Sequence, residues 1–371
     1  MKILTGYQEA LDYVKPFTFK ITAAENTLKY IFEHLHHNCY IVCSDGEKAE
    51  VSKLQSSSTA PSLRPYLTQK LNKTIKGSKR KALVNTLRSK EWRIMQCVVK
   101  PFKSSTDSLF PKFIADIKVP RGVYIFSLTD AQILREDGRE PWQMVTGPKD
   151  LGKYNFSEHL PIFAYSGQKG YLDIPIPTYD DIELYFNPYT APVVPWESKK
   201  EVAIFRGSPT GCGYTPETNQ RIKLATMKSD LLDVGLVETR SNGLKFDPVH
   251  GLGELSINIK KVSRIDMGKQ AEHKYIIHVD GNVLAYRLLK SMLLGSVILR
   301  VNSPYVHWLD HVMKPDKHYI EVKADLSDLE AKVSWCIDHD AKCKKIAENA
   351  KKFAVKALSP AFMRKYFEGL L

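Results

Sequence analysis

Cysteine is scarce in this sequence, and its few thiols follow no disulfide pattern. The 371 residues include 6 cysteines, none of them in a C-x-x-C pair. Cys336 and Cys343 stand seven residues apart in a stretch that we expect to be helical. That spacing is about 10 Å along a helix axis, too long for a disulfide bond. We therefore expect six reduced thiols, which excludes a disulfide-stabilised secreted scaffold.

Long hydrophobic runs are also missing. No stretch of about 18 consecutive apolar residues occurs, so no membrane-spanning helix is expected. Polar residues soon follow Met1, at Gln8 and Glu9, which leaves no apolar core for a secretory signal. The final four residues, 368–371, do not form an ER-retention signal. These absences predict a cytoplasmic protein.

Glycine and proline are too few for a collagen-like or low-complexity chain, with 20 residues of each. A hydrophobic content of 43% and a charged content of 26% indicate a folded protein, because a disordered chain buries less apolar surface. Single hydrophobic cores stop growing at roughly 250 to 300 residues. The length of the chain therefore predicts about two domains.

Acidic residues are outnumbered by basic ones, 41 against 54, and the excess is local. Residues 61–103 hold twelve Lys and Arg side chains and one acid, which accounts for +11 of the net charge of +13. This segment supports one alternative function, a non-enzymatic protein that binds nucleic acid or another anionic surface. Its aromatic content is low, with Tyr66 and Trp92 as examples, which is unfavourable for stacking on single strands.

Strand-like and helix-like segments alternate along the chain. We expect a polar loop over 44–69 and an interdomain linker in the proline-rich stretch 171–197. The alternation predicts an α/β fold with a parallel sheet covered on both faces. Helices are expected at 24–37, 108–118, 217–227, 282–294 and 326–357, and strands at 40–43, 123–128, 162–165, 202–205, 275–279, 296–301 and 319–322.

Two turns that follow expected strands contain residues suited to an anion. Parallel sheets bind ligands at the carboxyl ends of their strands. The first turn, 206–213, is rich in Gly and hydroxyl side chains and precedes a helix that carries Asn219 and Arg221. In the second, Gly281 precedes an expected helix start at 282–285, whose free N–H groups would attract phosphate, with Arg287 nearby. Either turn alone could be an ordinary connection between a strand and a helix, whereas the two together favour a shared anion site.

Asp130 follows a strongly apolar strand. It could be a general base at the ligand edge of the sheet, or it could simply cap the following turn. Metal signals are weak: His34, His36 and His37 lie near a helix end, and His307 with His311 lacks an accompanying carboxylate motif. Neither a P-loop nor a G-x-G-x-x-G motif occurs.

Several ordered motifs resemble the family 90 glycosyltransferases, the capsule-associated and protein O-glucosyltransferase relatives. They are the run 205–208 (FRGS), the segments 273–301 and 318–333, and VPRGVYIFSLTDA at 119–131, which is similar to that family's strand with the catalytic Asp. The resemblance covers about residues 92–357. It implies two Rossmann-like domains facing a cleft, the B-type glycosyltransferase fold, and inverting transfer of glucose or xylose from a UDP-sugar. The secretory relatives carry signal peptides and disulfides, which are not expected here.

The resemblance also implies domain limits. Residues 1–195 would form an N-terminal Rossmann-like domain on the acceptor side, with the basic segment 61–103. Residues 196–350 would form the C-terminal domain that binds the UDP-sugar. Residues 351–371 would be a C-terminal helix that packs back on the N-terminal domain.

The same resemblance implies roles for individual residues. Asp130 would be the general base, and Arg206, Gly207, Tyr179 and Asp181 would contact donor or acceptor. No metal or other cofactor is implied; the partners would be UDP-glucose or UDP-xylose and a glycan or protein acceptor, without nucleic acid. The donor-binding residues would be Ser208, Arg221, Asn282, Val283, Leu284, Ala285, Tyr286 and Arg287.

Overall fold

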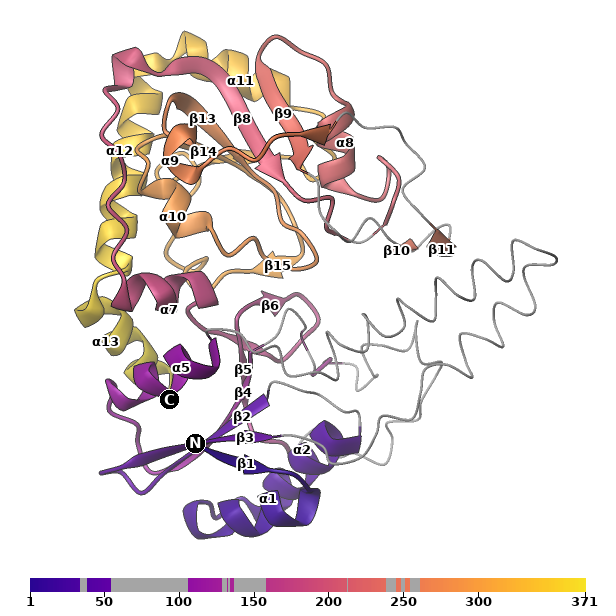
Figure 1. Ribbon diagram of the computed structural model, residues 1–371, viewed down its shortest axis with the longest axis vertical. Coiled ribbons are helices and arrows are strands. Elements are labelled where there is room, and N and C mark those ends of the chain that lie inside the picture. The colour runs from indigo at the N-terminus through magenta and orange to yellow at the C-terminus, as the bar shows by residue number, and fades with distance from the viewer. Residues whose placement is uncertain are drawn as a thin grey trace, which may run out of the picture. The chain divides into compact units, whose positions relative to one another are not determined.

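The structure is a computed structural model, and it describes most of the chain in separate segments. These comprise residues 1–33, 39–54, 106–128, 132, 134–136, 158–211, 213–237, 245–247, 251–253 and 261–371. They divide into two compact units (Figure 1). Unit 1 is Met1–Ile176 with Arg364–Leu371, and unit 2 is Pro177–Met363. The division at Ile176 falls inside the proline-rich stretch 171–197.

Unit 1 is built on a six-stranded mixed sheet in the order β1-β3-β2-β4-β5-β7. β2 runs antiparallel to both of its neighbours, β3 and β4, and the other pairs are parallel. The strands are β1 Lys2–Leu4, β2 Cys39–Ser44, β3 Ala49–Leu54, β4 Gly122–Ser127, β5 Ile162–Ala164 and β7 Ile174–Pro175; the helices are α1 Tyr7–Val14, α2 Ile21–Glu33 and α5 Thr106–Ala115.

The expected loop over 44–69 is wrong at its start, because residues 49–54 form β3. A short turn at Asp45–Lys48 returns the chain so that β3 pairs along the whole of β2. Lys53 on β3 is buried and places its ammonium 5.3 Å from the ring of Tyr40. A polar sequence can therefore be a strand here, since its main chain is held by a fully buried neighbour.

The end of the chain belongs to unit 1. The division falls within α13 Pro360–Leu370, and Phe367 is completely buried. Its ring lies 5.2 Å from that of Phe113 on α5 and 5.9 Å from that of Phe126 on β4. Glu368 also accepts a hydrogen bond of 2.9 Å from the Lys118 main-chain N–H.

Unit 2 contains an all-parallel sheet in the order β12-β9-β8-β13-β14-β16. Numbered along the unit, this is the order 3-2-1-4-5-6 of the Rossmann fold. The strands are β8 Lys200–Gly207, β9 Leu232–Val237, β12 Lys261–Val262, β13 His273–His278, β14 Val297–Val301 and β16 Ile320–Val322, and the helices include α7 Tyr179–Phe186, α8 Gln220–Thr226, α9 Met267–Gln270, α10 Leu288–Met292, α11 Leu329–Asp338 and α12 Asp340–Ala357.

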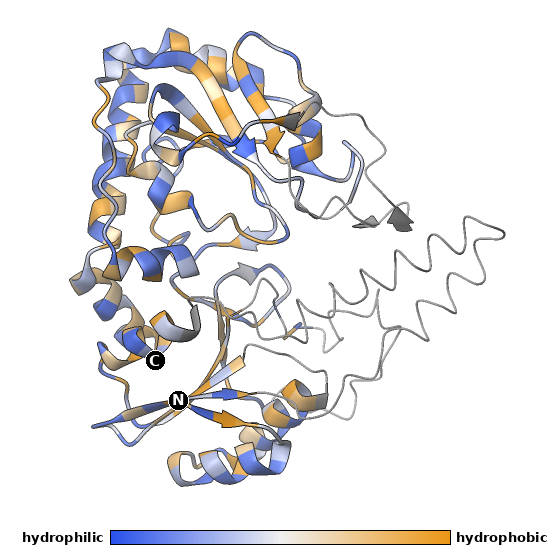
Figure 2. Cartoon of the chain, viewed as in Figure 1, coloured by the Kyte–Doolittle hydropathy of each residue, from blue (hydrophilic) through white to orange (hydrophobic). Residues whose placement is uncertain are grey.

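The core of unit 2 follows from the strand pattern. β13 is buried at every position, so both faces of the sheet are covered, as a parallel sheet requires. One face packs its alternate residues, such as Phe205 and Tyr275, against α11 and α12. Hydrophobic and hydrophilic residues alternate along α12 in Figure 2, which matches a helix with one buried face. The predicted α/β class is thus confirmed, with the Rossmann order in unit 2 and a mixed sheet in unit 1.

The expected separation of Cys336 and Cys343 is wrong, although both are free thiols. The chain breaks at His339 into α11 and α12, and the break brings the two buried side chains together. Their thiols share a hydrogen bond, which raises the pKa of Cys336. Among the described residues, no helix is both long and apolar enough to cross a membrane.

Candidate functional site

A pocket of about 390 Å³ lies at the carboxyl ends of the unit 2 strands. Its walls come from the turns after β8, β13, β14 and β16, together with the start of α8. β8 and β13 are the neighbours at which the strand order reverses, where Rossmann sheets bind their ligands. The volume lies within the roughly 300–1,000 Å³ of small-molecule sites. The lining residues are Gly211, Thr218, Asn219, Gln220, Asp280, Gly281, Asn302, Ser303, Pro304, Tyr305 and Ala324.

Arg221 on α8 clamps the turns after β8 and β13 to each other. Its Nε and Nη2 donate to the main-chain oxygens of Asp280 and Val279, both at 2.9 Å. Its Nη1 donates to Ser208 O at 3.1 Å and to Thr210 Oγ1 at 2.7 Å. These bonds use four of the five N–H donors of the guanidinium. The geometry makes Arg221 mainly a positioning residue for the pocket walls.

Arg287 also lies beside the ring of Phe205. The guanidinium carbons of Arg221 and Arg287 are 5.8 Å and 5.6 Å from the centre of the Phe205 ring. Among the described residues, Arg287 donates one side-chain hydrogen bond, to Arg206 O at 2.8 Å. Burial lowers the pKa of both arginines, and the charge of Arg287 lowers that of Arg221 further, to about 10. The buried Arg221 and the half-buried Arg287 place two positive charges near one ring, which favours the binding of an anion.

The expected helix start at 282–285 is wrong. α10 begins only at Leu288, and residues 281–287 form an irregular loop. Hydrogen bonds to residues outside the loop hold it in place. Ala285 N–H donates to Asp280 Oδ1 at 2.8 Å, and Tyr305 Oη donates to Asn282 O at 2.6 Å. The Asn282 side chain in turn accepts from Gly211 N–H at 2.9 Å. These contacts replace the helical hydrogen bonds expected from the sequence.

The other predicted residues of this loop are placed individually. Val283 and Leu284 are buried, and Ala285 and Tyr286 are half-buried. None of the four is among the lining residues of the pocket.

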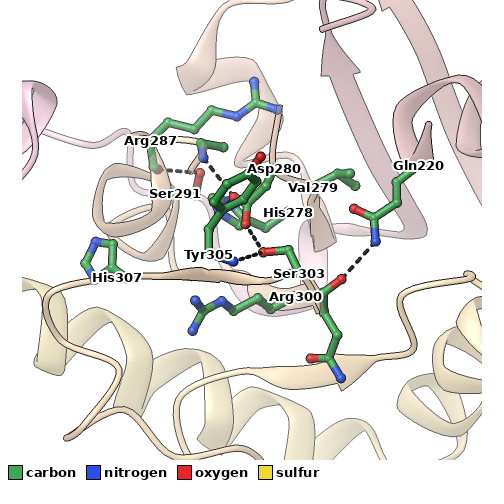
Figure 3. A network of polar contacts seen from close by, with 12 residues as sticks. Gln220, His278, Val279, Asp280, Arg287, Ser291, Arg300, Ser303, Tyr305 and His307 are labelled. Atoms are coloured by element: carbon green, nitrogen blue, oxygen red, sulfur yellow. Dashed lines mark hydrogen bonds and ion pairs between the residues drawn. The ribbon is translucent and has the colours of Figure 1, made fainter. Parts of the chain in front are cut away.

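Asp280 is the acidic centre of the polar network in Figure 3. Besides the Ala285 N–H, it accepts a bond of 2.5 Å from Ser303 Oγ at Oδ2. His278 Nε2 lies 3.6 Å from Oδ1. Burial raises the pKa of Asp280, while its bonds with Ser303 and Ala285 act in the opposite direction. Burial and the nearby arginines hold the pKa of His278 well below its usual value, so its ring is neutral.

The far wall of the pocket was not predicted. Gln220 Nε2 donates to Asn302 O at 2.8 Å (Figure 3). It also donates to Ala324 O at 2.8 Å, and so joins the ends of β14 and β16. Ala324 belongs to the turn that follows β16. This turn also contains Leu326, a buried residue with φ of 62°. The rule that ligands bind at strand ends would have pointed to Asn302 and Ser303, because they follow the expected strand 296–301.

Three predicted residues at the end of β8 have distinct placements. Arg206 turns toward β9, where its Nη2 lies 2.6 Å from Asp233 Oδ1 in an ion pair. Gly207 leaves no room for a side chain, since a Cβ would lie 2.7 Å from Phe205 Cζ. Ser208 is half-buried and is held through its main-chain oxygen by Arg221.

Asp181 is completely buried within unit 2. Its Oδ2 accepts from Thr178 N–H at 3.0 Å and Thr178 Oγ1 at 2.8 Å, which caps α7, and from Trp308 Nε1 at 2.8 Å. Burial raises the pKa of Asp181 to about 7. Tyr179, at the start of the same helix, is half-buried.

Asp130 and the basic segment 61–103 lie outside the described residues, as do His34, His36 and His37. Within the described part of the chain, no group of three or more His, Cys, Asp or Glu side chains could hold a metal ion.

Curated proteins that resemble this chain include viral and animal members. Protein 035R of Invertebrate iridescent virus 3 is 34% identical over 65% of this chain and 23% of its own length. Protein O-glucosyltransferase 2 of Danio rerio is 34% identical over 52% of this chain and 38% of its own length. Protein O-glucosyltransferase 3 of Homo sapiens is 30% identical, with 57% and 41% covered. The chain thus spans between about a quarter and two fifths of the length of these relatives.

Solved structures give a weaker likeness. The Anabaena protein HepE in complex with UDP-glucose matches over 86% of this chain and 85% of that chain, with 13% identity and a TM-score of 0.33. A sucrose-phosphate synthase from Thermosynechococcus elongatus matches 86% of this chain and 82% of that chain, with 10% identity and a TM-score of 0.35. At these values the likeness carries no inference about ligand or activity.

A family profile covers more than half of the chain, including all of unit 2. The family described as glycosyl transferase family 90 matches residues 146–371. This match includes every wall of the pocket, both arginines beside Phe205 and the network around Asp280. The resemblance seen in the sequence is therefore confirmed: the chain belongs to glycosyl transferase family 90.

Proposed function

We propose that the chain is an inverting glycosyltransferase that moves glucose or xylose from a UDP-sugar to a hydroxyl of a glycan or protein acceptor. The observation that carries this proposal is the pocket at the switch point of the unit 2 sheet, built throughout from residues within the family match. The names of the animal relatives favour glucose as the sugar. We propose a cytoplasmic location and no metal requirement.

The reaction needs a base for the acceptor. In the proposed mechanism, Asp130 takes the proton of the acceptor hydroxyl while that oxygen attacks the anomeric carbon. The bond from this carbon to the β-phosphate oxygen breaks, and UDP leaves from the opposite face, so the configuration inverts. A base of this kind contributes typically 10² to 10⁴ in rate.

The leaving diphosphate needs a positive environment, which we assign to Arg287. Arg287 keeps guanidinium donors beyond its bond to Arg206 O, and burial already lowers its pKa. An anion beside it would offset the cost of a positive charge that is half-buried and incompletely neutralised. Arg221 acts through the turns that it clamps, because four of its donors are already used. Fixed donors that need no reorganisation stabilise charge that develops in a transition state.

The basic segment 61–103 carries +11 of the net charge of +13. We propose that it lies on the acceptor side or contacts an anionic surface. Reversing the charges of Lys79, Arg80 and Lys81 should then impair acceptor use and spare UDP binding. Equal losses of both would contradict this role. Direct nucleic-acid binding, the alternative, would weaken steeply with added salt.

A transfer assay tests the proposed function. The full chain is incubated with UDP-glucose, UDP-xylose, UDP-galactose or UDP-GlcNAc and a panel of glycan and peptide acceptors, and UDP release and product anomeric configuration are measured. We expect release with UDP-glucose or UDP-xylose and an inverted product. Asp130→Asn should lower turnover by about 10² or more. Asp12→Asn, on the exposed surface of α1, removes the same charge and serves as the control.

Two results would contradict the proposal. Full turnover by Asp130→Asn with every donor would remove Asp130 as the base. The absence of any thermal stabilisation by UDP or a UDP-sugar would remove the donor class, because a ligand at 100 times its Kd adds about 2.7 kcal/mol of stability.

A further inference from the structure

The thiols of Cys336 and Cys343 form a buried pair that the proposed function does not use. Both side chains are 0% exposed, and neither is in a disulfide bond. Cys336 lies on α11 and Cys343 on α12, and the helical conformation is interrupted between them at His339. The two thiols share a hydrogen bond. Two sulfurs in contact on separate helices are the arrangement from which a disulfide bond can form.

The surroundings of Cys343 favour its thiolate, the form of cysteine that reacts with oxidants. Cys343 is the fourth residue of α12, close to a helix N-terminus that favours negative charge. The hydrogen bond with Cys336 lowers the pKa of Cys343, and Lys342 and Lys274 act in the same direction. Burial and the Asp340 carboxylate act against them, although Asp340 is itself paired with Lys274 at 2.7 Å. The hydrogen bond is the strongest of these effects, so Cys343 is the more acidic thiol of the pair.

Cys336 is the complementary thiol. Its hydrogen bond with Cys343 and its burial raise its pKa, whereas Lys332 acts in the opposite direction. Cys336 therefore keeps its proton while Cys343 is ionised. Close to both sulfurs, the buried Tyr275 Oη has no hydrogen-bond partner among the described residues. Burial and the two cysteines raise the pKa of Tyr275, so its hydroxyl remains a donor for an oxygen bound to either sulfur.

The pair lies near the surface of unit 2. Asp338, His339, Ala341 and Lys342, which stand between the two cysteines in the sequence, are all exposed. The first turn of a helix opens locally at little cost in free energy, which admits a molecule as small as hydrogen peroxide. Neither cysteine lines the pocket, so an inference about them does not depend on the proposed function.

We propose that Cys336 and Cys343 form an oxidation site, at which hydrogen peroxide converts the two thiols into a reversible disulfide bond between α11 and α12. The thiolate sulfur of Cys343 attacks one peroxide oxygen, the O–O bond breaks, and the second oxygen takes a proton and leaves as water. The sulfur of Cys336 then attacks the sulfenic acid on Cys343. The S–O bond breaks, and its oxygen leaves as a second water with the Cys336 proton. The two thiols thus lose two electrons, and one peroxide is reduced to two waters.

Peptide mapping of the full chain is the first test. Trypsin cuts after Lys332, Lys342 and Lys344, so the two cysteines fall in the peptides 333–342 and 343–344, which only a disulfide bond would keep together. The folded chain is treated with hydrogen peroxide, its remaining thiols are blocked with N-ethylmaleimide, and it is digested without reductant. We expect the linked peptides as the main product, separated again by dithiothreitol. Absence of the linked peptides would overturn the proposal.

Cys39 and Cys43 on β2 provide a control within the same sample. Both are 0% exposed, and burial raises the pKa of each to about 12. They stand four residues apart on one strand, about 13 Å, which is too far for a disulfide bond. We expect Cys336 and Cys343 to lose their thiols at least about tenfold faster than this strand pair. Equal rates would mean that peroxide reaches only the unfolded chain, and would overturn the proposal.

Alanine variants assign the role of each sulfur. In Cys336→Ala, peroxide should leave Cys343 as a sulfenic acid that dimedone labels, because the second thiol is missing. In Cys343→Ala, the Cys336 thiol should react about tenfold more slowly than the wild-type pair, as slowly as Cys39. Labelling of Cys336 rather than Cys343 would contradict the assigned order of attack. The comparison with Cys39 and Cys43 uses the wild-type chain, so the proposal stays testable if an alanine variant does not fold.

Discussion

Single residues at this site act mostly through their neighbours. Arg221 has the residue type and the sequence position expected of an anion ligand. Its guanidinium nevertheless donates hydrogen bonds to main-chain oxygens of two turns. Arg287 keeps its charge beside Phe205 with one described bond. Similar arginines can therefore have different roles, because each role depends on which acceptors the fold places within reach.

The buried side chains of Asp181 and His307 lead to a prediction about the pH dependence of stability. Asp181 Oδ2 and His307 Nε2 are 4.0 Å apart, and both side chains are 1% exposed. Burial raises the pKa of Asp181 to about 7 and lowers the pKa of His307 to about 3. Between about pH 4 and 6.5 the folded pair holds its proton on Asp181, whereas the unfolded chain holds it on His307. The proton count is the same, so the pair adds no pH dependence to the free energy of unfolding.

Removing either partner should make the free energy of unfolding depend on pH, with opposite signs in the two variants. Asp181→Asn leaves only His307, whose unfolded form binds the extra proton, so its stability should rise with pH from about 4 to 6.5 relative to the wild type. His307→Gln leaves only Asp181, whose folded form binds the extra proton, so its stability should fall with pH over that range. Each slope is at most about 1.4 kcal/mol per pH unit. Urea unfolding at four pH values measures it, and parallel curves for all three proteins would contradict the assignment.

At the scale of elements, the turns after β8 and β13 pack closely against each other at Gly281. A Cβ on Gly281 would lie 2.6 Å from Thr210 Oγ1 and 3.2 Å from Arg221 Nη2. Gly281→Ala should therefore displace Thr210 from Arg221 and cost about 1–3 kcal/mol in the free energy of unfolding, as overpacking does. It should also weaken UDP binding, because the clamped turns form the pocket wall.

Gly369→Ala is the matched control. Gly369 lies on α13, where a Cβ would have nothing within 4 Å, and alanine favours a helix. It should be neutral or slightly stabilising in the same urea unfolding. Equal behaviour of the two alanine variants would show that the turns adapt without strain.

At the scale of the whole molecule, the end of the chain completes the core of unit 1. Phe367→Ala removes a buried ring from contact with Phe113 and Phe126 and should cost about 3–5 kcal/mol in that unit. Hydrogen exchange with mass spectrometry locates the effect: peptides from β4 should exchange faster, and those from β13 should not. Lys365→Ala, at an exposed position of α13, is the control. Faster exchange in β13 as well would mean that the two units unfold together.

The local patterns of the sequence determined the class of the fold and the region of the site. Continuous apolar runs at 202–205, 275–279 and 296–301 identified buried parallel strands, because both faces of such a strand avoid water. The strand-end rule then pointed to the turns at 206–213 and 279–282, and the structure brings both to one pocket.

Only the tertiary structure decided which side chains line the pocket and what each one contacts. The start of α10 at Leu288, the role of Arg221 as a clamp and the far wall at Asn302, Ser303 and Tyr305 all depend on contacts between residues distant in the chain. The same is true of the meeting of Cys336 with Cys343. Periodicity reports which face of a segment is buried, whereas hydrogen bonds across the fold determine where a helix begins and which donors remain for a ligand.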